Sequence, residues 1–278
     1  MSGIVWLASY PKSGNTWLRV LLTNYLTDAS EPADIIQLSG GPIAGARRSF
    51  DEWAGVEGSA LDANVVDRLR PEVYRRLARD ADETLFVKVH DAWTRVDSGE
   101  PMFPADVTLG VVYIIRNPLD LAASCAHHWG TSIAAAVETL CDGAGSPTKC
   151  NLTGQLRQRL GSWGEHVRSW VDDSGTPLHV VRYEDLSTDP CGFFGDVVKF
   201  CGLDYDEDLV KKAVAFSSFG ELQRQEASAG FQERSHAAPG GFFRRGETGS
   251  WRDELPGDLA ERLMAAHHET MRRFGYAR

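Results

Sequence analysis

Short apolar runs alternate with amphipathic segments along this chain, a pattern that is typical of α/β proteins. Four runs rich in apolar and β-branched residues predict buried strands of a parallel sheet, at 4–9, 84–90, 107–116 and 177–182. Apolar stripes at helical spacing predict helices at 16–26, 119–129, 155–173, 193–200, 206–216 and 259–274. A further pair of helices is expected over 61–81, divided at Pro71. We therefore predict an α/β fold with a central parallel sheet flanked by helices.

Three stretches lack such periodicity, at 28–59, 131–153 and 226–241. Each is rich in glycine or polar residues, and loops of this length are usually functional or mobile. We expect them to wall a binding site. The remaining pattern is continuous, and 278 residues suffice for one full hydrophobic core. A single domain over residues 1–278 is the prediction.

The amino-acid composition indicates a globular protein and argues against two kinds of partner. Hydrophobic residues make up 42% and charged residues 24%, which are globular values. The chain contains no apolar run approaching the ~20 residues that span a bilayer, and no secretory signal is visible, so we expect no membrane partner and a cytoplasmic location. The net charge of −10 argues against a nucleic-acid partner.

Five cysteines with no CxxC motif and no zinc-like spacing indicate reduced thiols and no metal site. Cys141 and Cys150 flank a loop rich in glycine and proline, and a bond between these two residues is the open alternative.

The segment 4–26 joins a predicted strand, the loop PKSGN and an amphipathic helix without a break. Gly14 permits close approach of a ligand, and the helix that follows directs its free N–H groups and positive dipole end into the loop. We expect an anion there, although an ordinary strand-to-helix turn has the same local pattern. An ATP-binding Walker loop places its lysine directly after the last glycine, whereas Lys12 precedes Gly14 by two residues. The order of residues therefore argues against ATP.

Other candidate residues lie at the carboxyl ends of the predicted strands. His90, Arg116 and Tyr183 each end or follow one, as Lys12 does. Because ligands of open parallel sheets bind at the carboxyl ends of the strands, we expect these four side chains along one edge.

Four segments, in order, resemble the cytosolic-type sulfotransferases, which use 3′-phosphoadenosine 5′-phosphosulfate (PAPS). They are YPKSGNTW at 10–17, KVH at 88–90, IIRNPLDLAAS at 114–124 and FFRRGETGSW at 242–251. The segments at 183–186 and 217–219 are similar to two further parts of that pattern. The short chain and ASYPKSGNTW are most similar to bacterial members, including those that sulfate glycopeptide antibiotics. The resemblance implies the P-loop NTPase-like sulfotransferase fold.

The resemblance also implies roles for single residues, with 3′,5′-adenosine diphosphate (PAP) as the product of PAPS. In the family the first loop holds the 5′-phosphosulfate, the adenine lies between aromatic rings, and arginines with a serine bind the 3′-phosphate. The corresponding residues are Lys12, Ser13, Gly14, Asn15, Thr16, Trp17, Arg116, Ser124, Tyr183, Phe219, Arg244, Arg245 and Gly246.

His90 corresponds to the catalytic base of the family, and an imidazole suits proton abstraction near neutral pH. Lys12, with Lys88, would stabilise charge on the leaving phosphate. For a lone histidine, a structural role is the alternative. The expected acceptor is a small-molecule, sugar or natural-product hydroxyl, and no metal is expected.

Two departures from the family pattern limit what the resemblance implies. The sequence Asp91-Ala92-Trp93 replaces the usual proline-containing continuation after the histidine, so the acceptor pocket cannot be carried over. The dimer motif of animal members is absent after Trp251, which leaves a monomer or a homodimer. An ATP-dependent small-molecule kinase and a catalytically inactive PAPS-binding protein are the competing interpretations.

Overall fold

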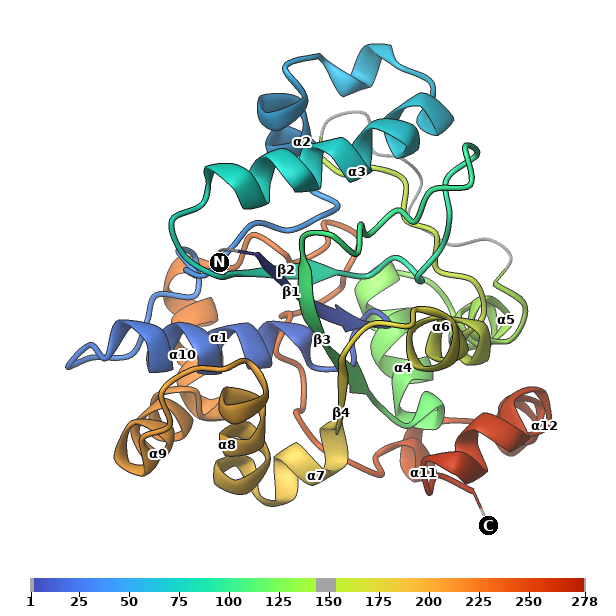
Figure 1. The fold of residues 1–278 in the computed structure, drawn as a ribbon. Coiled ribbons are helices and arrows are strands. Elements are labelled where there is room, and N and C mark those ends of the chain that lie inside the picture. The colour runs from blue at the N-terminus through green and yellow to red at the C-terminus, as the bar shows by residue number, and fades with distance from the viewer. Residues whose placement is uncertain (1–2, 144–153, 278) are drawn as a thin grey trace.

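The computed structural model describes residues 3–143 and 154–277. Within them, four parallel strands form one sheet in the order β2-β1-β3-β4 (Figure 1). The strands are β1 (Ile4–Ser9), β2 (Leu85–Val89), β3 (Thr108–Ile115) and β4 (Leu178–Arg182). Each lies within one residue of its predicted bounds, so the prediction of a central parallel sheet is confirmed.

Helices cover both faces of this sheet (Figure 1). Those described are α1 (Asn15–Thr27), α2 (Arg47–Ala54), η1 (Gly58–Ala60), α3 (Ala63–Asp80), α4 (Pro118–Trp129), α5 (Ile133–Asp142), α6 (Trp163–Arg168), the π-helical η2 (Ser169–Asp173), α7 (Tyr183–Thr188), α8 (Pro190–Phe200), α9 (Glu207–Phe216), α10 (Phe219–Ala229), α11 (Trp251–Glu254) and α12 (Gly257–Arg273).

Alternate residues of β1 enter different cores, as the side-chain period of a strand requires. Val5 and Leu7 pack with α1, α8 and α9. Trp6 and Ala8 pack on the opposite face with α3, α4, α5, α6 and α12. A third cluster joins Val20 of α1 to Leu222 of α10 and to Phe243. This third cluster attaches the C-terminal segment 231–243 to the first helix.

The predicted division of the 61–81 region at Pro71 is wrong. Pro71 lies inside the continuous helix α3, although a proline in a helix interior removes one hydrogen bond and costs about 3 kcal/mol. Val66, Val73, Tyr74 and Leu77 are buried along one side of α3. Burial of this stripe against the sheet offsets the local cost.

The predicted helix over 155–173 is also wrong in its first half. The backbone N–H of Leu156 donates to the carbonyl of Gly45 at 2.8 Å, and that of Arg159 donates to the Asp91 carboxylate at 2.8 Å. These partners replace the helical ones, and α6 begins only after Ser162. There the Ser162 and Glu165 side chains form a reciprocal capping box.

The three stretches predicted as long loops are partly helical. Helix α2 lies within 28–59 and η1 begins at its end, α5 lies within 131–153, and α10 extends to Ala229 at the start of 226–241. Residues 144–153 lie outside the described residues. Cys150 is among them, so the alternative that Cys141 pairs with Cys150 stays open.

Candidate active site

The loop between β1 and α1 has a conformation that few sequences adopt. Lys12 has φ of 69° and Gly14 has φ of 106°, both in the left-handed region that favours glycine. A Cβ added to Gly14 would lie 2.7 Å from Cδ2 of Tyr183. Gly14 is therefore required by its backbone angle and by the close approach of Tyr183. The Asn15 amide donates to the Leu7 carbonyl at 2.7 Å and fixes the loop to the end of β1.

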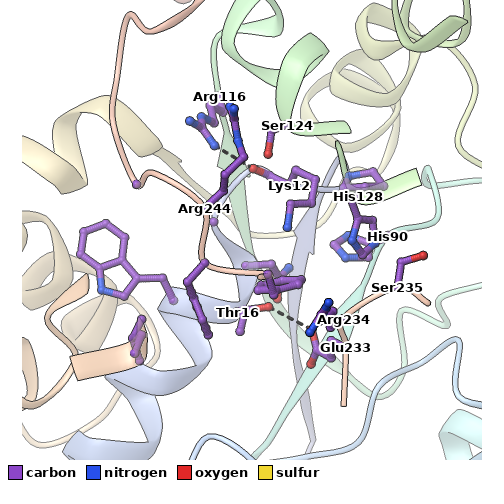
Figure 2. A pocket seen from close by; sticks show the side chains of 18 of the residues that line it. Lys12, Thr16, His90, Arg116, Ser124, His128, Glu233, Arg234, Ser235 and Arg244 are labelled. Atoms are coloured by element: carbon purple, nitrogen blue, oxygen red, sulfur yellow. Dashed lines mark hydrogen bonds between the residues drawn. The ribbon is translucent and has the colours of Figure 1, made fainter. Parts of the chain in front are cut away.

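A cavity of about 860 Å³ opens at the carboxyl ends of the strands (Figure 2). Lys12, His90, Arg116 and Tyr183 all line it, as the sheet-edge rule predicts. Of the thirteen predicted donor-binding residues, all except Ser13 line this cavity. The Ser13 side chain is buried, and its hydroxyl has no hydrogen-bond partner in the described part of the chain.

The Lys12 ammonium lies 3.5 Å from the centre of the Phe242 ring, in a cation–π contact. Burial lowers the pKa of Lys12 to about 7, with Lys88 and Arg116 contributing in the same direction. Charge on Lys12 is thus costly in the empty cavity. An anion placed in the loop would stabilise the protonated form.

Arg116 connects the first loop to the C-terminal segment. Its guanidinium donates to the Lys12 carbonyl at 3.1 Å and to the Glu247 carbonyl at 3.0 Å, and it lies 4.3 Å from the centre of the Tyr183 ring. Its Nε is buried and has no partner among the described residues. Ser124 lines the same cavity from α4 (Figure 2). A donor remains available here for an anionic ligand.

The segment 244–246 closes this side of the cavity. Arg244 forms a bidentate ion pair with Glu254, with Nη2 at 2.8 Å from Oε2, and Arg245 is partly exposed at 3.6 Å from the same carboxylate. Gly246 has φ of 68°, and a Cβ added there would lie 2.5 Å from the Phe219 ring. The sequence therefore brings both arginines to the cavity, but the Glu254 carboxylate already holds Arg244.

Three aromatic residues enclose the same region. Trp17 and Tyr183 meet edge to face, with ring centres 5.9 Å apart, and Phe219 begins α10 beside them. The Trp17 indole N–H donates to the carbonyl of Ser217 at 2.9 Å, and the Tyr183 hydroxyl donates to that of Gly246 at 3.1 Å. The polar edges of Trp17 and Tyr183 are paired in this way, and Arg116 covers one face of Tyr183, so the remaining ring faces are the surfaces left for a planar ligand.

His90 follows β2, and one of its ring nitrogens is held by the neighbouring strand. Nδ1 lies 2.8 Å from the carbonyl of Ser9, which can only accept, so Nδ1 carries the proton and Nε2 keeps its lone pair. Burial, reinforced by Lys88, holds the pKa of His90 well below its usual value. The imidazole is thus neutral at pH 7 with an accepting Nε2. It lines the cavity beside His128 (Figure 2).

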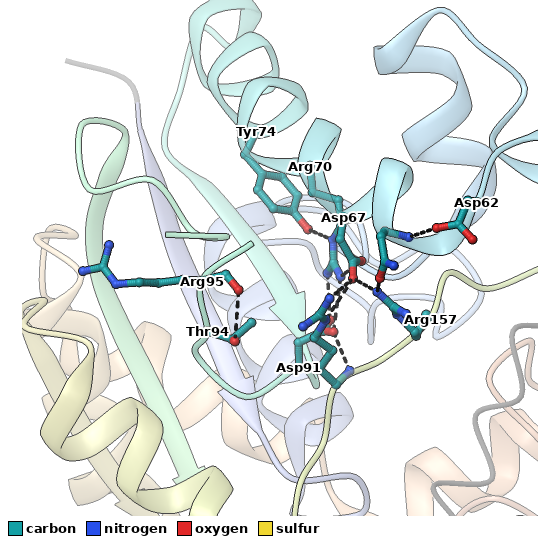
Figure 3. A network of polar contacts seen from close by, with 10 residues as sticks. Asp62, Asp67, Arg70, Tyr74, Asp91, Thr94, Arg95 and Arg157 are labelled. Carbon is teal, nitrogen blue, oxygen red and sulfur yellow. Dashed lines mark hydrogen bonds and ion pairs between the residues drawn. The ribbon is translucent and has the colours of Figure 1, made fainter. Parts of the chain in front are cut away.

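The backbone around His90 is anchored by buried polar contacts. His166 Nε2 donates to the His90 carbonyl at 3.0 Å, and His166 Nδ1 accepts from the Tyr113 hydroxyl at 2.8 Å. Asp91 forms a bidentate pair with Arg70, at 2.7 and 3.2 Å, and both side chains are almost fully buried (Figure 3). The turn that carries the imidazole is therefore tied to α3 and α6.

One charged residue of the cavity has no signal in the sequence. Glu233 accepts from the Lys88 ammonium at 2.6 Å and pairs with Arg19 at 2.5 Å. It also accepts from the Thr16 hydroxyl at 3.0 Å (Figure 2). Its partners are distant in sequence, with Thr16 lying 217 residues away. Local pattern could not have identified it.

His128 is a second neutral imidazole on the cavity wall. Burial lowers its pKa to about 3, with the nearby Lys12 and Lys88 contributing in the same direction. Its ring meets Phe242 edge to face at 5.8 Å.

None of the described helices has the length and apolar character needed to cross a membrane. Within residues 3–143 and 154–277, no group of three or more His, Cys, Asp and Glu side chains is placed to hold a metal ion.

Taken together, the fold and the site define an α/β protein with a glycine-containing strand-to-helix loop at the carboxyl edge of a parallel sheet. The chain belongs to the sulfotransferase-domain family, whose model matches residues 3–275. It is similar to sulfotransferase 2A6 of Rattus norvegicus, with 29% identity over 168 residues, or 59% of this chain and 57% of that protein. The match thus spans little more than half of that relative.

Two further comparisons cover more of both chains. Sulfotransferase 1A1 of Canis lupus familiaris is 25% identical over 272 residues, or 95% of this chain and 82% of that protein. The solved structure of retinol dehydratase in complex with androsterone and the inactive cofactor PAP superimposes with a TM-score of 0.64 at 20% identity, over 96% of this chain and 80% of that chain. The structural likeness confirms the predicted sulfotransferase fold.

Proposed function

We propose that this protein is a PAPS-dependent sulfotransferase that transfers a sulfuryl group to a hydroxyl of a small-molecule, sugar or natural-product acceptor. One observation carries the proposal: a single cavity joins the Lys12 loop, the Arg116 and Ser124 pair, three aromatic rings and the lone pair of His90. Membership of the sulfotransferase family and the PAP bound in a structural neighbour support the choice of donor.

The donor would bind along the edge of the sheet. The backbone of the loop around Gly14, the N-terminus of α1 and Lys12 suit its 5′-phosphosulfate. Arg116, with Ser124 and the arginines at 244 and 245, suits its 3′-phosphate. Trp17, Tyr183 and Phe219 suit the adenine.

The reaction follows from these positions. Bound PAPS supplies the sulfuryl group and becomes PAP when the acceptor oxygen bonds to sulfur and the bond from sulfur to the phosphate oxygen breaks. His90 Nε2 accepts the acceptor's hydroxyl proton, while the Nδ1 contact to Ser9 holds the tautomer. Lys12 and Lys88 stabilise the negative charge that develops on the phosphate.

The acceptor would bind on the side of the cavity away from the aromatic rings. Gln158 is a buried polar residue of the cavity lining, and its amide can both donate to and accept from an acceptor hydroxyl. Ser235, His128 and Trp129 line the same cavity. These neutral polar groups favour a hydroxylated acceptor over a charged one. Androsterone is bound by the retinol dehydratase neighbour.

Two competing functions use the same cavity. A small-molecule kinase would need ATP and Mg²⁺, and the position of Lys12 two residues before Gly14 argues against it. We expect EDTA to leave activity intact, and loss of activity restored by Mg²⁺ would favour the kinase. An inactive PAPS-binding protein would show donor binding without turnover.

Domain organisation, location and oligomeric state belong to the same proposal. Residues 1–278 would form one sulfotransferase domain of a cytoplasmic protein, acting as a monomer or homodimer. The similarity of ASYPKSGNTW to bacterial enzymes that sulfate glycopeptide antibiotics stays a prediction from the sequence.

A panel of sugars, phenols and glycopeptides incubated with sulfur-labelled PAPS tests donor and acceptor together. Transfer of label to one class of acceptor is the expected result. Binding of PAPS without transfer to any acceptor would favour the inactive protein, and the absence of PAPS binding would refute the proposed function.

A further inference from the structure

Glu233 is a charged side chain of the cavity that takes no part in the proposed chemistry. Its carboxylate is mostly buried, with an exposed fraction of 16%. It lies on the segment that follows α10, and its contacts reach the ends of two other elements: Thr16 and Arg19 at the start of α1, and Lys88 in β2. All three contacts are within hydrogen-bond distance.

These contacts keep Glu233 ionised. Burial alone would raise its pKa, but the Lys88 ammonium and the Arg19 guanidinium outweigh burial and hold the pKa well below its usual value. Burial lowers the pKa of Lys88, and Glu233 opposes that shift. The two side chains therefore form a buried pair in which each stabilises the charge of the other.

The groups that hold Glu233 include those expected to hold the donor. Thr16 belongs to the anion-binding loop, and Lys88 leads to His90 at the transfer end of the cavity (Figure 2). A sulfuryl oxygen that approached Lys88 would meet a carboxylate oxygen already 2.6 Å from the same nitrogen. Two anions sharing one buried cation repel each other strongly.

We propose that Glu233 is a specificity-determining residue for the donor, because its carboxylate occupies the anion position that the sulfuryl end of PAPS needs. This inference rests on the proposed function. PAPS must displace the carboxylate from Lys88 and Thr16 or share them with it. PAP lacks the sulfuryl group, so it can bind while Glu233 stays in place. Glu233 thus disfavours PAPS relative to PAP.

Arg19 makes the exchange possible without leaving a buried charge unpaired. It contacts the other carboxylate oxygen, Oε1, at 2.5 Å and does not line the cavity. A carboxylate that leaves Lys88 can therefore keep its second cation. Lys88 in turn exchanges one anionic partner for another.

The Glu233→Gln variant tests the inference, since it removes the charge and keeps the shape. Dissociation constants for PAPS and PAP are measured by calorimetry without acceptor, and their ratio is the readout because it is independent of the folded fraction. We expect PAPS to gain about tenfold over PAP, within the range usual for coupled ligands. An unchanged ratio, or a shift toward PAP, overturns the inference.

Two further variants make the result interpretable. The control is Glu221→Gln, which also removes one negative charge. Glu221 lies on α10 and pairs with Arg224 outside the cavity, so this variant should leave the PAPS-to-PAP ratio unchanged. If Glu233→Gln does not fold, Arg19→Met replaces it. Loss of that cation leaves a displaced carboxylate buried without a partner, so the ratio should shift toward PAP, and an unchanged ratio overturns the inference. Wild-type protein that binds neither nucleotide would refute the proposed function instead.

Discussion

Without a bound anion Lys12 is largely neutral above pH 7, and this property gives a measurable proton exchange. Burial lowers its pKa from 10.5 to about 7 in the empty cavity, so the lysine is largely neutral at pH 8.5. PAP binding should raise that pKa and draw a proton from solution at pH 8.5, but not at pH 6, where Lys12 is already protonated. Calorimetry in buffers of different ionisation enthalpy measures the uptake.

The Lys12→Met variant is the control for this exchange. It should bind PAP more weakly and lose most of the uptake at pH 8.5. Equal uptake by the variant would assign the proton to another group and contradict the low pKa of Lys12.

Without a ligand, the lowered pKa of Lys12 makes the folded state bind fewer protons than the unfolded chain between about pH 7 and pH 10. The contribution of Lys12 to stability therefore rises with pH across that window.

Single residues also show where reasoning from sequence ends. The order of residues around Lys12 and Gly14 was sufficient to predict the strand-to-helix turn, whereas anion binding by this loop stays a prediction. The Asn15 side-chain amide donates to the Leu7 carbonyl and the Ser9 hydroxyl, and the contact of Asn15 with phosphosulfate that the resemblance implies stays a prediction. Glu233 could not be predicted, because tertiary packing alone brings it to Lys88, 145 residues away.

At the scale of elements, the turn from β1 to α1 depends on Gly14. Gly14→Ala should destabilise the protein by about 1–3 kcal/mol and greatly weaken PAP binding, because a Cβ adds strain at positive φ and meets the Tyr183 ring. Urea unfolding and calorimetry check both effects.

Gly55→Ala is the matched control, since Gly55 also has positive φ, 69°, but no atom lies within 4 Å of an added Cβ. It should lose stability from strain alone and bind PAP normally. If Gly14→Ala binds PAP as well as Gly55→Ala does, the loop is not the anion site.

An element could be predicted from sequence when its backbone hydrogen bonds are those of the regular structure that its apolar pattern indicates. The four strands are apolar runs whose partners lie in one sheet, and their pattern was sufficient. The segment 155–160 has a helical apolar stripe, but its backbone bonds to Gly45 and Asp91 instead. A local signal did exist at Ser162 and Glu165, whose spacing is that of a capping box.

At the scale of the whole molecule, buried ion pairs join α3 to the site. Arg70→Met would leave the Asp91 carboxylate buried beside an uncharged side chain, and the expected loss of stability is about 3–5 kcal/mol. The Arg75→Met variant breaks partly exposed pairs with Asp106 and Glu100 and should cost less than about 1 kcal/mol. Denaturant unfolding of both variants makes the comparison, and equal losses would contradict the assigned role of Arg70.

The same network shows why the whole site was only partly predictable. Asp91 was recognised as a departure from the family pattern, but its partner Arg70 lies 21 residues away on α3. Asp67 of the same helix forms ion pairs with Arg157 and Arg159. These two arginines are the sequence neighbours of the cavity residue Gln158. The position of the site at the sheet edge could be predicted from the strands. The ion pairs that hold the neighbouring segments could not, because they join residues that are distant in sequence.

The central claim, sulfuryl transfer with His90 as base, is tested most directly by the single-turnover rate and PAP affinity of His90→Ala, using an acceptor from the labelled-PAPS panel. Loss of the proton acceptor should lower the rate by about 10² to 10⁴ and leave PAP affinity unchanged. Arg116→Ala should instead weaken PAP binding, because it removes charge-assisted contacts. A His90→Ala variant that keeps a near-normal rate, or loses PAP affinity and thermal stability together, would contradict the account.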